Sequence, residues 1–197
     1  MEDGTIIELI WKGYCEFFFW WVTFLTHRSQ SQVTCLIKSF ILSYMYLINL
    51  KKLASPWFIY CGLHGRFLDH DIHLPKLEVL NLRANYDLSG NFPRFSENNS
   101  LMELDLSITN LSGEISASIG NLQSLQTLDL SNCEFSGSIP TSISNLKSLQ
   151  TLDLSYCQFS GSIPTSIGNL KSLQTLDLSN CEFSGSIPTS IDNLKSL

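Results

Sequence analysis

The sequence predicts a solenoid of stacked 24-residue repeats, with short parallel strands side by side on one face. Three segments that begin at residues 132, 156 and 180 are nearly identical, and each contains the letters FSGSIPTSI. A leucine motif of the form LxL recurs at the same interval back to residue 80. Because side chains alternate along a strand, both leucines of each LxL face the core, and only stacking of neighbouring repeats buries them.

The composition is that of a folded chain with an acidic excess. Apolar residues make up 44% of the 197 residues and charged residues 15%, which excludes a disordered chain. Twelve lysines and arginines against eighteen acidic residues give a net charge of −6, which argues against nucleic-acid binding. Six cysteines are too few for a fold that disulfides alone hold together.

The segment 1–48 is strongly apolar and lacks the repeat. Its apolar runs, 17–25 and 40–50, are shorter than the roughly 20 residues that a membrane-spanning helix needs. Glu2 and Asp3 stand where a signal peptide would be basic, so we recognise no signal peptide in this chain. We expect 1–48 to be helical or disordered, and to be either a membrane-associated segment or a stretch that does not belong to a working protein.

The repeats are expected from residue 49 to the end. Residues 49–73 are predicted to form a degraded repeat, and 74–197 clear repeats that are truncated before a last LxL strand. One repeat period before the first clear repeat, Leu53, Pro56 and Phe58 stand at the leucine positions of the degraded repeat. Neither end shows a cap, so we expect exposed apolar faces at both ends and interpret the chain as a fragment.

Each repeat continues beyond its LxL strand with a cysteine and a proline. Ser-Gly before Ile-Pro favours a turn, and the proline suits the convex side because it needs no ladder donor. The cysteines stand at one repeat position, where a small thiol fits a buried column. These cysteines are Cys61, Cys133, Cys157 and Cys181. Parallel Cβ vectors in neighbouring repeats disfavour disulfides, so we predict free buried thiols.

The full pattern, LxxLxxLxLxxN/CxLxGxIPxxIxNL, resembles the plant-type extracellular leucine-rich repeat, and its specific part is the element GxIP. This element lies at Gly137, Ile139 and Pro140, at Gly161, Ile163 and Pro164, and at Gly185, Ile187 and Pro188. Cysteine at the asparagine position, with the segments CGLHG and HLPKLEVLNLRANYDLSGNFP, is similar to plant receptor-like proteins. The resemblance covers 49–197 and implies a horseshoe or right-handed superhelix. A parallel sheet lines its concave face, and short 3₁₀ or irregular segments form the convex side.

The residue between the two leucines of each LxL should face the concave groove. It is acidic in four successive repeats, at Asp105, Asp129, Asp153 and Asp177. Carboxylates about 5 Å apart would repel one another, raise some pKa values and attract a basic ligand. The favoured interpretation is that these residues are simply the repeat's consensus, with neighbouring serine and threonine hydroxyls as partners.

The few differences between the near-identical repeats point to a second set of candidate ligand-binding residues. Two sets of differing positions flank the exit of the concave strand: Asn132, Tyr156 and Asn180, and Glu134, Gln158 and Glu182. A third set, Ser144, Gly168 and Asp192, is expected on the convex side. Tyr156 is the strongest single candidate, because an exposed aromatic side chain is a typical anchor of an interface. Neutral drift at exposed sites would produce the same pattern.

Two sequons predict glycosylation at Asn98 and Asn110 if the chain is exported. No serine is accompanied in register by a histidine–aspartate pair, and neither a phosphate-binding glycine loop nor a kinase element is present. We therefore expect no enzyme activity, no catalytic residue, no metal site and no cofactor.

The resemblance implies a protein- or peptide-recognition module of a plasma-membrane or extracellular receptor-like protein in defence or developmental signalling. Such proteins lack a kinase and act with a co-receptor kinase. Two alternatives stay open. One is a secreted inhibitor of a pathogen enzyme, similar to polygalacturonase-inhibiting proteins, and the other is a non-functional receptor remnant.

Overall fold

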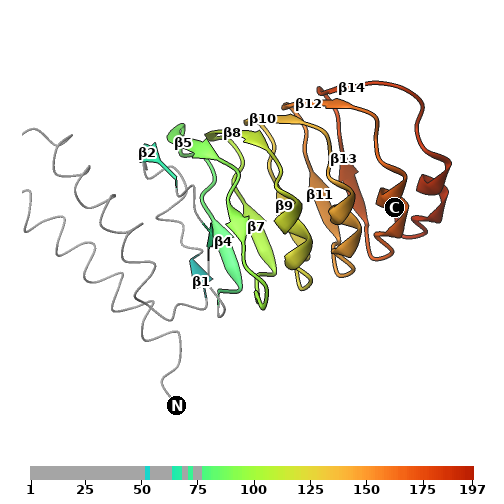
Figure 1. Cartoon of the computed structure of the whole chain (residues 1–197), viewed down its shortest axis with the longest axis horizontal. Coiled ribbons are helices and arrows are strands. Elements are labelled where there is room, and N and C mark those ends of the chain that lie inside the picture. The colour runs from blue at the N-terminus through green and yellow to red at the C-terminus, as the bar shows by residue number, and fades with distance from the viewer. Residues whose placement is uncertain (1–51, 54–63, 68–70, 73–76) are drawn as a thin grey trace, which may run out of the picture. The chain divides into compact units, whose positions relative to one another are not determined.

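The computed structural model describes residues 52–53, 64–67, 71–72 and 77–197. The chain separates into two units after Lys51. The first unit, with the predicted segment 1–48, lies outside the described residues, as does Cys61. The second unit is the predicted solenoid, in which successive repeats stack along one axis (Figure 1). The domain boundaries at 48 and 73 stay predictions.

The LxL segments form the first of two six-stranded parallel sheets. Its strands, in order, are β1 (Lys52–Leu53), β4 (Val79–Asn81), β7 (Glu103–Asp105), β9 (Thr127–Asp129), β11 (Thr151–Asp153) and β13 (Thr175–Asp177). The central leucines, such as Leu128 and Leu152, pair in register and are fully buried. The flanking residues are half-exposed in most of these strands, which confirms the predicted alternation.

A second parallel sheet was not predicted. It consists of β14 (Glu182–Phe183), β12 (Gln158–Gly161), β10 (Glu134–Gly137), β8 (Asn110–Glu114), β5 (Asp87–Asn91) and β2 (His64–Arg66). The Ser-Gly pair expected in a turn therefore ends a strand, at Ser136 and Gly137. Gly137 has φ 78°, where a side chain is disfavoured, so the chain leaves the sheet at this glycine. A short pair, β3 (Asp71–Ile72) with β6 (Arg94–Phe95), lies apart from both sheets.

Short 3₁₀ helices complete the repeats, as the sequence predicted for the convex side. They are η1 (Ala117–Asn121), η2 (Thr141–Asn145), η3 (Thr165–Asn169) and η4 (Thr189–Asn193). Pro140 precedes η2 with φ −69°, so its ring already holds the extended conformation of a helix cap. The N–H of Leu146 ends the same helix by donating to the carbonyl of Ile143. Ser144, Gly168 and Asp192 lie in η2, η3 and η4, on the side where they were expected.

The register of the degraded repeat differs from the prediction. Leu53 pairs with Leu80, whereas the repeat period placed Pro56 opposite Leu80. A proline has no N–H to donate to the hydrogen-bond ladder, so Pro56 is disfavoured at the middle of a strand. The shift puts a leucine at the central position instead.

The core is a stack of leucines joined by a row of phenylalanines. Phe135 and Phe159 are fully buried, and their rings stack with centroids 6.4 Å apart and an interplanar angle of 16°. Phe92 meets Phe135 edge to face at 5.8 Å. In the last repeat the stacking continues to Phe183, whose side chain is half-exposed. Ile187 in that repeat is 68% exposed, which agrees with the apolar face expected at this end.

Beyond each LxL strand one residue adopts the left-handed conformation. These residues are Ala84, Ile108, Asn132, Tyr156 and Asn180, with φ between 54° and 61°. The N–H groups of the first four still bond the next repeat, as from Asn132 to the carbonyl of Ser155 at 3.0 Å. Asparagine tolerates this conformation, whereas a β-branched side chain is strained there.

We predict that Ile108→Asn stabilises the protein by about 1 kcal/mol, because it relieves left-handed strain at φ 57°. The reverse change at the equivalent position, Asn132→Ile, is the matched control and should cost about 1 kcal/mol. Urea denaturation of the full chain measures both. A lower midpoint for Ile108→Asn would contradict the assignment of strain.

Candidate functional site

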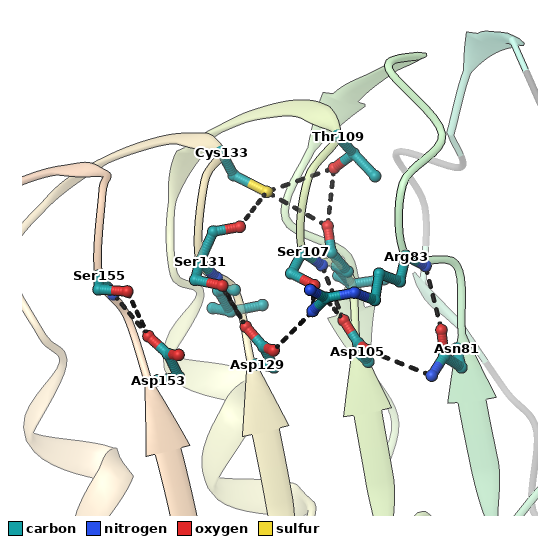
Figure 2. Close-up of polar contacts among 12 residues, drawn as sticks. Asn81, Arg83, Asp105, Ser107, Thr109, Asp129, Ser131, Cys133, Asp153 and Ser155 are labelled. Carbon is teal, nitrogen blue, oxygen red and sulfur yellow. Dashed lines mark hydrogen bonds and ion pairs between the residues drawn. The ribbon is translucent and has the colours of Figure 1, made fainter. Parts of the chain in front are cut away.

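The four predicted aspartates lie side by side at the carboxyl ends of β7, β9, β11 and β13, in register across the sheet. Figure 2 shows the first three, Asp105, Asp129 and Asp153. In each case one carboxylate oxygen, Oδ1, accepts a hydrogen bond from the backbone N–H two residues later. At Asp105, Asp129 and Asp153, Oδ1 also accepts from the hydroxyl of that serine, at 2.6–2.7 Å. These contacts confirm the predicted serine partners, and they hold each aspartate in one orientation.

Asn81 and Arg83 extend this row at its N-terminal end. The Asn81 amide donates to Oδ2 of Asp105 at 3.2 Å, and its oxygen accepts from the N–H of Arg83 at 3.1 Å. Nη1 of Arg83 donates to the Ser107 hydroxyl at 2.8 Å and forms an ion pair with Oδ2 of Asp129 at 3.3 Å. The N-terminal half of the aspartate row is therefore partly neutralised from within the chain.

Sequence reasoning missed the role of Arg83. Its signal was nevertheless present, because Arg83 stands at a position that is serine in the following four repeats, at Ser107, Ser131, Ser155 and Ser179. Aligning the repeats shows one long, positively charged side chain at a position where the others have a short hydroxyl.

The aspartates differ in their environments. Asp105 is buried, with 8% of its surface exposed, and this burial raises its pKa. The negative charge of Asp129 raises the pKa of Asp105 further, against the lowering effect of the bonds from Ser107. At Asp177, hydrogen bonding from the Ser179 side chain and backbone lowers the pKa. Burial therefore raises the pKa of Asp105 more than repulsion between the carboxylates does.

The second predicted set lies beside the aspartate row. Asn132, Tyr156 and Asn180 are exposed at the left-handed positions, and Tyr156 is 58% exposed. Glu134, Gln158 and Glu182 are exposed at the first positions of β10, β12 and β14. The differences between near-identical repeats at these two positions thus gather along one edge of the first sheet. Their role in ligand binding stays a prediction.

The cysteine column lies under this edge. Cys133, Cys157 and Cys181 are free thiols, the first two buried and the third half-buried, which confirms the prediction for the first two in full. Each thiol donates to a leucine carbonyl of the preceding repeat, as from Cys157 to Leu130 at 3.1 Å. Asn85 and Thr109 occupy the same position in earlier repeats, but they donate to leucine carbonyls of their own repeat, those of Leu82 and Leu106.

Both sequon asparagines are exposed, Asn98 before β7 and Asn110 at the start of β8. Glycosylation at these residues stays a prediction. Among the described residues, no group of three or more histidines, cysteines and acidic residues is arranged to hold a metal ion. The same part of the chain contains no helix that is long and apolar enough to cross a membrane.

We predict that Asp105 titrates above pH 3.8 and Asp177 below it. A raised folded-state pKa favours folding most at low pH, and this contribution is lost as pH rises through the folded pKa of Asp105. The lowered pKa of Asp177 acts oppositely: its contribution is present above pH 3.8 and lost as pH falls through the folded pKa. Carboxyl ¹³C NMR titration checks the order, and Asp177 titrating above Asp105 would contradict it.

The three described thiols should differ in reactivity. Burial raises the pKa of Cys157 to about 12 and also raises that of Cys133, so little reactive thiolate forms at neutral pH. Cys181 is more accessible, so iodoacetamide should alkylate it first in the folded protein. Peptide-resolved mass spectrometry measures the order, with urea-unfolded protein as the control in which the three rates converge. Faster labelling of Cys157 than of Cys181 would be inconsistent with this packing.

Comparison with known proteins supports the same architecture. The family model described as a leucine-rich repeat region matches residues 73–197. Receptor-like protein 6 of Arabidopsis thaliana is 37% identical over 82 residues, which are 42% of this chain and 8% of that protein. The chain thus spans less than a tenth of the length of this curated relative.

Two solved structures are similar over most of the chain. The PEPR1–AtPEP1 structure is 32% identical with a TM-score of 0.65, and covers 75% of this chain and 20% of that one. The structure of the Arabidopsis receptor kinase HAESA with the peptide hormone IDA and the co-receptor SERK1 is also 32% identical. Its TM-score is 0.52, and it covers 64% of this chain and 26% of that one. The repeat, the fold and these similarities show that the chain belongs to the leucine-rich repeat family, in the form found in plant extracellular receptors.

Proposed function

We propose that this chain is a ligand-recognition part of a plant cell-surface receptor and binds a peptide on the exposed face of its first sheet. The observation that carries the proposal is the distribution of differences between near-identical repeats. Their core residues are unchanged, whereas two of the three differing positions lie along the edge beside the aspartate row. A surface that varies over a constant scaffold is typical of repeat proteins that recognise other molecules.

The chemistry of this face suits binding rather than catalysis. Tyr156 offers an exposed ring at a left-handed position, and exposed amides stand at Gln158 in the same repeat and at Asn132 in the preceding one. A rigid aromatic anchor with polar neighbours is a common arrangement at hot spots. The aspartates already bind serines, so they are fixed acceptors rather than paired acids and bases.

The partners follow from the solved relatives. HAESA is bound to a peptide hormone and a co-receptor in its structure, and PEPR1 to AtPEP1. By analogy, we infer a peptide ligand for this chain, a co-receptor kinase as the signalling partner, and a plasma-membrane or extracellular location. Roles in defence and in development are both compatible with this proposal.

To test this, the full chain is immobilised and used to capture peptides from plant apoplastic fluid. The dissociation constants of the captured peptides are then compared between the unchanged chain and its variants. Tyr156→Ala should weaken binding about 10-fold, because truncation of an aromatic anchor typically costs more than about 1 kcal/mol. Thr165→Ala, at the exposed start of η3, is the control and should change binding less than twofold. Circular dichroism melts establish that both variants fold.

Two results would overturn the proposal. One is capture of no peptide, and the other is equal loss of binding for Tyr156→Ala and Thr165→Ala. Inhibition of a fungal polygalacturonase by a chain that binds no peptide would instead favour the secreted-inhibitor alternative.

A further inference from the structure

Arg83 shows how this sheet face binds a guanidinium group. Its side chain crosses two repeats, because it contacts Ser107 in the next repeat and Asp129 in the repeat after that. Figure 2 shows the arginine over the ends of the neighbouring strands, between these two partners. Its side chain is 40% exposed, so the contact forms on the open face and not in the core.

The atoms that receive the guanidinium are oriented beforehand. The Ser107 hydroxyl donates its hydrogen to Oδ1 of Asp105 at 2.6 Å, which leaves its oxygen lone pairs for Nη1 of Arg83 at 2.8 Å. Oδ1 of Asp129 is occupied by Ser131, which leaves Oδ2 for the arginine. Both contacts offered to the cation are therefore acceptors, and one of them is charged.

The same acceptor pair recurs in the next two repeats. Ser131 donates to Asp129, and Ser155 donates to Asp153, each at 2.7 Å, so both hydroxyl oxygens present lone pairs as Ser107 does. Strands β9, β11 and β13 pair with an unchanged offset of one repeat. Asp153 therefore lies next to Ser131, and Asp177 next to Ser155, in the way that Asp129 lies next to Ser107. Within the described part of the chain, no side chain bonds Oδ2 of Asp153 or Asp177.

Among the described residues, none supplies a cation to these two positions. The residues equivalent to Arg83 are Ser107 and Ser131, and a serine side chain is far too short to reach the following repeats. Tyr156 follows Ser155 directly, and its backbone N–H bonds the carbonyl of Ser179 at 3.0 Å. Tyr156 thus adjoins the second position along the chain, and its side chain is 58% exposed, so its ring is accessible for a cation–π contact.

We propose that Ser131 with Asp153, and Ser155 with Asp177, bind arginine side chains of the peptide ligand in the way that Ser107 and Asp129 bind Arg83. This inference rests on the proposed function and specifies the chemistry of its ligand. Both Arg83 contacts come from one nitrogen, Nη1, so the preference for arginine rests on its guanidinium, which is planar and more weakly hydrated than an ammonium. The ligand is therefore an extended peptide that presents arginine to the C-terminal half of the face.

The test uses the full chain and two acetylated, amidated probe peptides, Gly-Arg-Gly-Arg-Gly and Gly-Lys-Gly-Lys-Gly. Each is titrated at low salt, where screening is weak, and followed by NMR. The arginine probe should shift the resonances of Ser131, Ser155, Asp153 and Asp177, and should bind about 3- to 10-fold more tightly than the lysine probe. Equal affinities for the two probes, or shifts confined to other surfaces, would overturn the proposal.

Three variants sharpen the result. Asp177→Asn should abolish the shift at Ser155 and keep the shift at Ser131. Ser131→Arg should place a guanidinium of the chain itself on Ser155 and Asp177, and so block the same site. Arg83→Ala should do the opposite and open a third site, seen as a new shift at Ser107. Thr165→Ala on η3 is the control, and a loss of probe binding with it equal to that with Asp177→Asn would overturn the proposal.

These outcomes separate the two proposals. If the arginine probe fails to bind while captured plant peptides still lose affinity with Tyr156→Ala, the guanidinium sites are wrong and the proposed function stands. If the probe binds at the predicted serines while no plant peptide binds, the sites stand and the proposed function is wrong.

Discussion

The unchanged offset between neighbouring strands is the constraint on which the rest of the structure depends. Because β9, β11 and β13 pair residue by residue, each one repeat after the last, every repeat position becomes a column in space. Columns of leucine bury one another, and the phenylalanines stack with centroids 6.4 Å apart between consecutive repeats. One repeat exposes both of its stacking surfaces, so its stability comes from its neighbours.

The same constraint turns polar residues into ladders. Beneath the edge, a column of amide, hydroxyl and thiol donors bonds leucine carbonyls, from Asn85 through Thr109 to Cys133. On the open face, aspartates bind serines and become fixed acceptors. Burial distinguishes Asp105 from Asp177, although both stand at the same repeat position. Identical local sequence therefore acquires different chemistry according to its place in the stack.

The residues in the left-handed conformation affect both the stability of the fold and the proposed recognition surface. In the three C-terminal repeats the side chain at this position is exposed, at Asn132, Tyr156 and Asn180, whereas Ala84 at the same position is buried. Asparagine suits this conformation, whereas Ile108 is strained in it. Variation at this column changes the exposed surface without disturbing the leucine core, because the backbone bond to the next repeat is kept, as at Asn132 and Tyr156.

The sequence by itself determined the period, the LxL strands of the first sheet and the free thiols of Cys133 and Cys157, because each follows from a repeated local pattern. The 3₁₀ segments of the convex side were implied by the family resemblance. The sequence also located the aspartate row and its serine partners. Only the tertiary structure decided the second sheet, since a short segment ending at Gly137 forms a strand only when neighbouring repeats supply hydrogen bonds. It likewise decided the pairing of Leu53 with Leu80 and the reach of Arg83 to Asp129, because both depend on which residues stacking brings together and not on their distance along the chain.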